Sequence, residues 1–153
     1  MAELAETLGY EGHFVEAESL YRETLDIERR VLGPEHPATL SLMSGLAVVL
    51  SAEGHYAEAE KLERETLEIR RRRFGPDHPD TAGSTYDLAC IEARKGDRDG
   101  ALSLLREAVD HGLAPLMDLW MQKDPFLKSL HGDPRFDALV AHAKEKAAAA
   151  AKK

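Results

Sequence analysis

Apolar residues recur every three or four positions along most of this chain, with charged residues between them. From Phe14 to Leu32 the apolar positions follow the helical period, while Glu and Arg side chains fill the opposite side. The pattern breaks at glycines and at Gly-Pro pairs, which end helices. We therefore expect an all-α fold. The expected helices are residues 2–10, 14–32, 37–53, 56–74, 79–95 and 97–111.

The same helical pattern repeats along the chain. Gly12 recurs as Gly54 and again as Gly96, so each step is 42 residues (54 − 12 and 96 − 54). A fixed period of this length is typical of a stacked repeat array. One such unit has too little apolar surface to form a core alone and must pack on its neighbour. Function then belongs to the outer surface of the stack, which favours a binding module over an enzyme.

The linkers inside the repeats are almost identical, GPEHP at 33–37 and GPDHP at 75–79. In each, a glycine suits the position just past a helix, and the final proline suits the first turn of the next helix. His36 and His78 precede that proline, so we expect them to act in a turn or a helix cap rather than as metal ligands or bases.

After Gly112 the repeat decays into two short phrases, DPFLKSLHG and DPRFDALVAHA. In each phrase an Asp before a Pro predicts a capped helix start. The last repeat of an array exposes an apolar face that must be covered. We therefore divide the chain into a repeat array at 1–112, truncated in its first repeat, a helical C-terminal cap at 113–146, and an Ala/Lys tail at 147–153 that is expected to fray.

Composition narrows the classes of partner. The net charge of −8 disfavours binding to a phosphate backbone, so we expect no nucleic-acid partner. No apolar run approaches the ~18 residues of a membrane-spanning helix, and the N-terminus lacks the features of a secretory signal. Cys90 is the one cysteine, which rules out a disulfide within the chain and suits a reducing compartment. We expect a cytoplasmic protein without a membrane partner.

The phrase LAxxxxxxGxYxEAExLxRETLEIRRRxxGPxHPxT, from Leu46 to Thr81, resembles the tetratricopeptide repeat (TPR) family. The form it resembles is the 42-residue repeat of kinesin light chains and many bacterial proteins. The resemblance implies an α-solenoid in which antiparallel helix pairs form a right-handed superhelix and the first helix of each pair lines a concave groove for a peptide or partner protein. The ending DPFLKSLHGDPRFDALV is similar to that of bacterial TPR proteins, some of which begin with a serine/threonine kinase. It implies a larger multidomain bacterial parent protein.

The family's register also implies which residues face the groove. Members that bind peptides often carry Asn before the Leu-Ala pair, where this chain has Gly45 and Asp87. The strongest anchors are expected to be Tyr86, Asp87 and Arg94. The implied partner-binding residues are Tyr10, Ser44, Val48, Ser51, Tyr86, Asp87, Cys90 and Arg94.

No pattern in the sequence indicates catalysis or a bound cofactor. Phosphate-binding glycine loops, zinc-protease helices, paired cysteines and nucleophile elbows are all missing. A metal shared by His13 and His55 would require neighbouring helix pairs to converge, so we expect no metal and no cofactor. The run 70–73 of four arginines is expected to be a solvated helix end, with Arg72 at ion-pair spacing from Glu68. Trp120 is expected in the core or cap.

Two functions follow. The first is a non-catalytic protein–protein interaction module that acts as a scaffold through the groove. The alternative is an architectural module, because the truncated first helix leaves an apolar edge near Leu4, Leu8 and Phe14 through which two copies could form a homodimer.

Overall fold

The two Gly-Pro linkers stop one helix and start the next. Gly33 and Gly75 have φ angles of 92° and 85°, in the left-handed region that glycine adopts without steric cost. The imidazole Nδ1 atoms of His36 and His78 each accept a hydrogen bond of 3.2 Å from the backbone N–H two residues further on. A proline then occupies the first turn of the next helix. The capping role expected for both histidines is confirmed.

The computed structural model describes residues 1–113 and 117–151, and within these residues every regular element is a helix. The six helices expected in the array are all present to within two residues at each end. In the described part of the chain, no helix combines the length and the apolar character needed to cross a membrane. The elements are α1 (Ala2–Tyr10), α2 (Phe14–Val31), α3 (Pro37–Ala52), α4 (Tyr56–Phe74), α5 (Pro79–Lys95), α6 (Arg98–Asp110), α7 (Met117–Lys123), the 3-10 helix η1 (Pro125–Leu130) and α8 (Pro134–Ala150).

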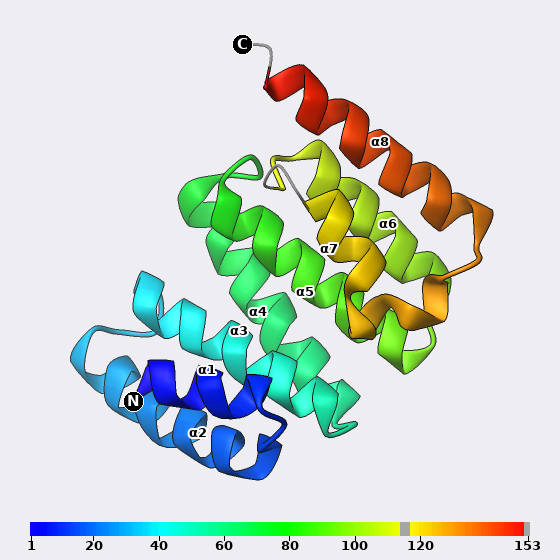
Figure 1. Cartoon of the computed structure of the whole chain (residues 1–153). Helices are drawn as coiled ribbons and strands as arrows, with labels where there is room; N and C mark the ends of the chain where they lie inside the picture. Colours follow the sequence, from blue (N-terminus) through cyan, green and yellow to red (C-terminus); the bar gives the residue numbers. More distant parts are fainter. Residues whose placement is uncertain (114–116, 152–153) are drawn as a thin grey trace. The chain divides into compact units, whose positions relative to one another are not determined.

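The first of two compact units spans Met1–Arg73. In it, α2 packs on α3, and α1 packs on both (Figure 1). Ala17 and Ala59, which hold the same register in α2 and α4, are fully buried, as expected of small residues at a close helix approach. The larger buried side chains of this unit are Tyr21, Leu25, Leu40, Met43, Leu46, Leu50 and Leu67.

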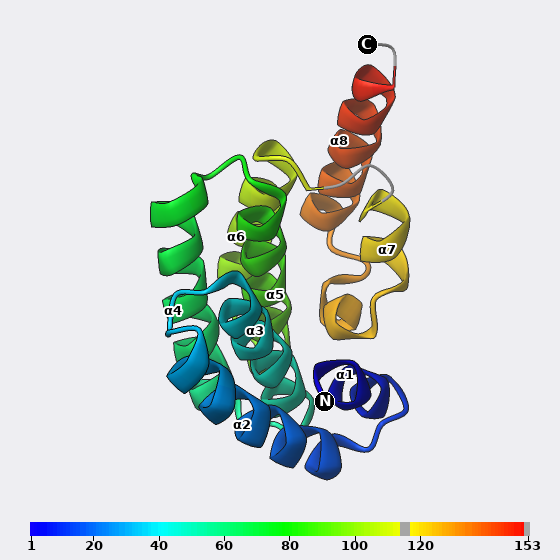
Figure 2. The ribbon, with the colours of Figure 1, turned by 90° about the vertical axis from the view of Figure 1, so that its left-hand side faces the viewer.

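The second unit spans Phe74–Lys153. Here α5 and α6 form a helix pair, η1 packs on α5, and α8 packs on both α6 and α7 (Figure 2). The two Asp-Pro phrases therefore cover the apolar faces of α5 and α6, as an array cap is expected to do. One continuous core results, and its largest side chains are Leu105, Met121, Leu127, Leu130, Phe136 and Leu139.

Helix α8 runs to Ala150 in the C-terminal region, and the expected fraying of the 147–153 tail stays a prediction. Two other features of this region differ from expectation. The first Asp-Pro phrase forms a 3-10 helix rather than an α-helix. Trp120 was expected in the core or cap, but its side chain is 65% exposed. The first described helix of the expected cap is α7, which begins at Met117, and residues 114–116 lie outside the described part.

Candidate functional site

One face of α5 holds a short segment of the same chain. The Tyr86 hydroxyl donates a hydrogen bond of 2.7 Å to Oδ2 of Asp124, and the Cys90 thiol lies 3.7 Å from the same oxygen. Tyr86 and Cys90 are four residues apart and so lie one above the other on the helix. Both side chains are only 7% exposed. Two of the groove residues implied by the sequence therefore converge on one carboxylate.

The next turn of α5 continues this contact. The Arg94 guanidinium lies 4.8 Å from the centre of the Phe126 ring, a cation–π geometry. The Ser129 hydroxyl donates a hydrogen bond of 3.1 Å to the backbone carbonyl of Ala93. Leu127 and Leu130 are fully buried in the apolar core beside α5 and α6. We call Tyr86, Cys90, Ala93 and Arg94 the α5 face, and residues 124–130 the docked segment.

Asp124 both shapes the docked segment and attaches it. Its Oδ1 accepts a hydrogen bond of 2.8 Å from the backbone N–H of Phe126, which caps the start of η1. Its Oδ2 accepts the bond from Tyr86. Pro125 occupies the first turn, where a missing N–H costs nothing. The Asp-Pro pair thus starts the local helix while its second oxygen is directed at α5.

Burial also keeps the Tyr86 hydroxyl and the Cys90 thiol of the α5 face protonated. Desolvation, reinforced by the neighbouring Cys90 and the Asp124 carboxylate, raises the pKa of the Tyr86 hydroxyl well above its usual value. Burial and then the Asp124 charge raise the pKa of the Cys90 thiol. Both groups therefore stay protonated near neutral pH and can donate to a carboxylate. A protonated thiol is a poor nucleophile, so Cys90 is not activated for covalent chemistry in this arrangement.

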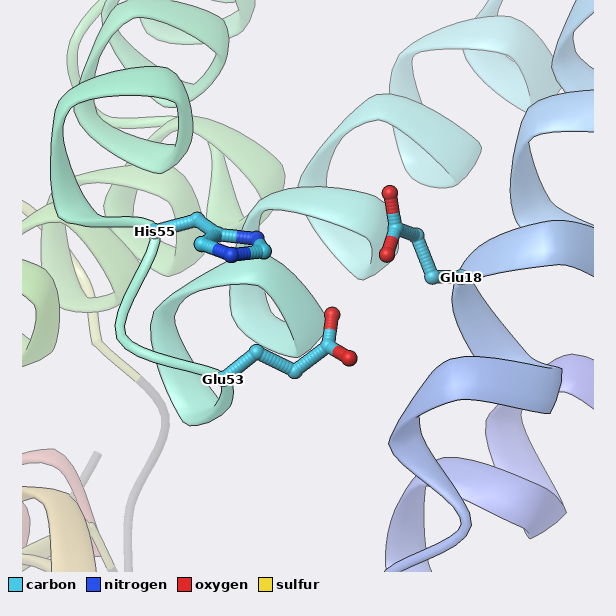
Figure 3. A group of neighbouring side chains, drawn as sticks. All are labelled: Glu18, Glu53 and His55. Carbon is cyan, nitrogen blue, oxygen red and sulfur yellow. The ribbon is translucent and has the colours of Figure 1, made fainter.

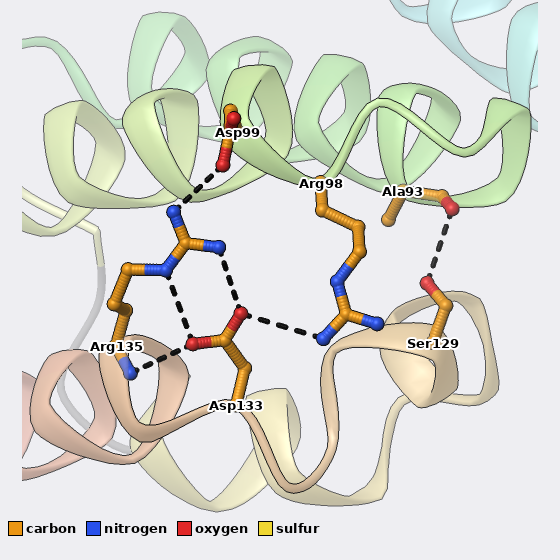
Figure 4. A network of polar contacts seen from close by, with 6 residues as sticks. All are labelled: Ala93, Arg98, Asp99, Ser129, Asp133 and Arg135. Carbon is orange, nitrogen blue, oxygen red and sulfur yellow. Dashed lines mark hydrogen bonds and ion pairs between the residues drawn. The ribbon is translucent and has the colours of Figure 1, made fainter.

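A second contact, the ionic clip of Arg98, Asp99, Asp133 and Arg135, holds the start of α8 against α6 (Figure 4). Asp133 accepts bonds of 2.9 Å from Arg135 Nη2 and 3.3 Å from Arg98 Nη2. Arg135 Nη1 also donates to Asp99 at 2.6 Å. The Arg135 hydrogen bonds, more than any other cause, hold the pKa of Asp133 well below its usual range. The sequence indicated the Asp133 cap but not its guanidinium partners.

The implied groove residues of the first unit have different surroundings. Tyr10 is 86% exposed, and Val48 is half-buried. Ser44 and Ser51 are buried, which limits their access to a partner. The Ser44 hydroxyl donates to the buried Glu63 carboxylate at 3.1 Å and accepts from Arg70 at 3.3 Å. In the second unit, Asp87 is half-buried.

The arginine run at the end of α4 is exposed at 71–73, as its sequence predicts, but its first member is buried. Arg70 is only 7% exposed and bonds to Ser44 on α3. Arg72 pairs with Glu35 of the preceding linker, and Arg73 donates to the Glu35 backbone carbonyl at 2.7 Å. The expected partner Glu68 is four residues away on the same helix, but helix packing brings Glu35 to the arginines. This run ties α4 to the α2–α3 linker.

A third group of side chains lies at the α3–α4 turn, where Glu18, Glu53 and His55 point toward one another (Figure 3). Their potential ligand atoms lie within 4.8 Å of one another. The Arg22 side chain bonds Glu18 at 2.7 Å and lowers the pKa of its carboxyl, while burial and Glu18 raise that of Glu53. The sequence pointed to His55 only together with His13. Two carboxylates and an imidazole are groups that bind cations, but Arg22 competes for Glu18, and the expectation of no metal stays a prediction.

A family model described as tetratricopeptide repeat matches residues 1–72 and 64–111. The chain belongs to the tetratricopeptide repeat family. Proteins with this repeat generally serve as protein–protein interaction modules, and this TPR chain shares that repeat across most of its length.

Two solved structures have a similar fold. They are a kinesin light chain-type protein from Podosopora anserina with nearly identical TPR-like repeats, and a single-substitution variant of it. The first has a TM-score of 0.70 at 24% identity, and the second 0.69 at 24%. Each match covers 99% of this chain and 74% of that chain. At this identity the likeness shows the TPR fold alone. No curated protein matches the sequence.

Proposed function

We propose that the TPR chain is a non-catalytic interaction module whose first-helix faces bind a peptide or partner protein. One observation carries this proposal: the α5 face already holds a peptide segment through side chains at the implied groove positions. Tyr86 bonds Asp124, and Arg94 stacks on Phe126. These contacts use one hydroxyl, one thiol, one guanidinium and one backbone carbonyl. They recognise a peptide and perform no chemistry on it.

The test is capture on the immobilised full chain, followed by direct titration of each captured protein in purified form. The double substitution Tyr86→Ala/Arg94→Ala removes both anchors of the α5 face and is expected to weaken binding at least tenfold. Arg106→Ala, at an exposed arginine of α6 outside the α5 face, is the matched control. Unchanged affinity in the double variant, with its helix content retained, would reject the α5 face as the binding surface.

A specific exposure pattern supports self-association as a second function. Met1, which precedes α1, and Leu4 on α1 are 59% and 56% exposed. One repeat later, Met43 and Leu46 occupy the same register and are 0% and 2% exposed. Apolar positions that the repeat buries elsewhere are thus open at the N-terminal edge, and a second copy that presents the same edge would cover them.

The measurement is light scattering coupled to gel filtration across a hundredfold range of concentration. The wild-type chain is expected to show a mass that rises toward that of a dimer, and Leu4→Glu is expected to remain monomeric because the carboxylate cannot be buried at such an edge. Glu3→Gln, at the neighbouring exposed position, is the control. A wild-type chain that stays monomeric throughout would remove this alternative.

A further inference from the structure

The TPR chain contains both a peptide-binding surface and a peptide that fits it. The docked segment reads Asp-Pro-Phe-Leu-Lys-Ser-Leu and lies on the α5 face. We propose that the α5 face is a site for peptides with an acidic residue followed by an aromatic residue and leucines, and that the docked segment is its resident ligand. An external peptide of the same class then replaces the resident segment. This inference rests on the proposed function, because it names the peptide class for the same surface.

Each position of the docked segment defines one requirement. The acidic residue accepts the Tyr86 hydroxyl at 2.7 Å and lies 3.7 Å from the Cys90 thiol. Two residues later, the aromatic ring lies under the Arg94 guanidinium at 4.8 Å. Charged hydrogen-bond acceptors and cation–π partners are specific, so neutral or aliphatic residues at these two positions fit poorly.

The remaining positions extend the match. Leu127 and Leu130, three and six residues after the acid, are fully buried. The hydroxyl of Ser129 donates to the carbonyl of Ala93 in the last turn of α5, which also accepts a bond of 3.3 Å from the backbone N–H of Gly96. A peptide from another chain can make all of these contacts, because each uses a single side chain or one backbone carbonyl.

The arrangement lets the docked segment leave without the rest of the cap. The ionic clip attaches α8 to α6 through Asp133 and Arg135, which lie outside residues 124–130. Phe126 is half-buried and Ser129 is exposed, so the outer side of the segment is open to solvent. An external peptide of the same class would make the contacts that the docked segment makes. Its leucine side chains would fill the apolar site that Leu127 and Leu130 occupy.

Cys90 reports whether the segment is docked. It is the one cysteine of the chain and lies against Asp124. A buried thiol reacts slowly with a disulfide reagent and reacts faster once uncovered. The experiment uses the full chain and a fluorescent synthetic peptide, KDPFLKSLH, which copies residues 123–131. Thiol reactivity and peptide anisotropy are measured on the same preparations.

The test variant is Asp124→Ala/Phe126→Ala, which removes both anchors from the resident segment and leaves the α5 face intact. It is expected to react at Cys90 at least tenfold faster than the wild type. It is also expected to bind the peptide at least tenfold more tightly, because a tethered segment competes at an effective concentration in the ~mM range. A peptide in which Asp is replaced by Asn and Phe by Ala is expected not to bind. Asp137→Ala, an exposed Asp of α8, is expected to behave as wild type.

A variant that keeps its helix content but binds the peptide no more tightly than wild type overturns the inference, and the segment is then a fixed cap. Should the double variant unfold, Phe126→Ala alone removes the contact with Arg94 and keeps the Asp124 cap, and at least threefold tighter peptide binding is expected. Wild-type affinity in that variant overturns the inference as well. The proposed function is tested by a different result: it is rejected when no purified protein binds any form of the chain.

Discussion

Replacing glycine by alanine is expected to have opposite effects on stability at Gly45 and at Gly83. Both glycines lie inside helices, α3 and α5, where alanine is the better helix former by about 1 kcal/mol. A Cβ atom added at Gly83 meets nothing within 4 Å. A Cβ atom added at Gly45 comes within 2.6 Å of two ring carbons of Tyr21, a distance that Cβ atoms essentially never show. Gly83→Ala should stabilise the chain and Gly45→Ala should destabilise it.

The structure sets the size of the effect at Gly45. Tyr21 is 6% exposed, so its ring cannot move aside into solvent, and the same burial raises the pKa of its hydroxyl to about 12. Overpacking a buried site costs about 1–3 kcal/mol, against a gain in helix propensity of about 1 kcal/mol. We expect a net loss of up to about 2 kcal/mol, which corresponds to a fall of up to about 8 °C in Tm.

The assay is thermal unfolding by circular dichroism, with Gly9→Ala as a control in the same unit as Gly45, because its new Cβ would lie at an ordinary 3.6 Å from Val49. A double-mutant cycle with Tyr21→Ala isolates the contact, since removing the ring should make Gly45→Ala neutral or stabilising. A rise in Tm for Gly45→Ala in the wild-type background would refute the reasoning.

Substitutions at Asp133, His78 and Arg70 probe the helix caps and the buried charges. The folded state lowers the pKa of Asp133, so its stabilisation is fully present above the unfolded pKa of about 3.9 and is lost progressively as pH falls from there through the lower folded pKa. Asp133→Asn should therefore lower Tm at pH 7, and the loss of Tm should shrink as pH falls below about 4. His78→Ala should cost about 1 kcal/mol in urea unfolding, and His78→Asn should restore it, because Asn also caps. Arg70→Ala should lower the free energy of unfolding by about 3 kcal/mol in chemical denaturation, because the buried Glu63 then loses a nearby cation. Arg71→Ala, at an exposed position of the same helix, should lower it by less than about 0.5 kcal/mol.

The sequence by itself determined the features that depend on neighbours along the chain. Helix positions follow from apolar spacing, and the linker glycines, the two histidine caps and the Asp-Pro starts act within a few residues of themselves. The repeat register also placed Tyr86, Cys90 and Arg94 on one side of α5. Local geometry of this kind is fixed by backbone sterics and hydrogen bonding, so a 42-residue period was enough to predict it.

Only the tertiary structure decided which distant groups meet. Asp124 bonds Tyr86 across 38 residues, and Arg72 pairs with Glu35 across 37 rather than with its helical neighbour Glu68. Such pairs depend on how whole helices pack, and packing is determined by the summed burial of many side chains rather than by any short pattern. The residues of the α5 face could therefore be predicted from register, while the segment that occupies it could not.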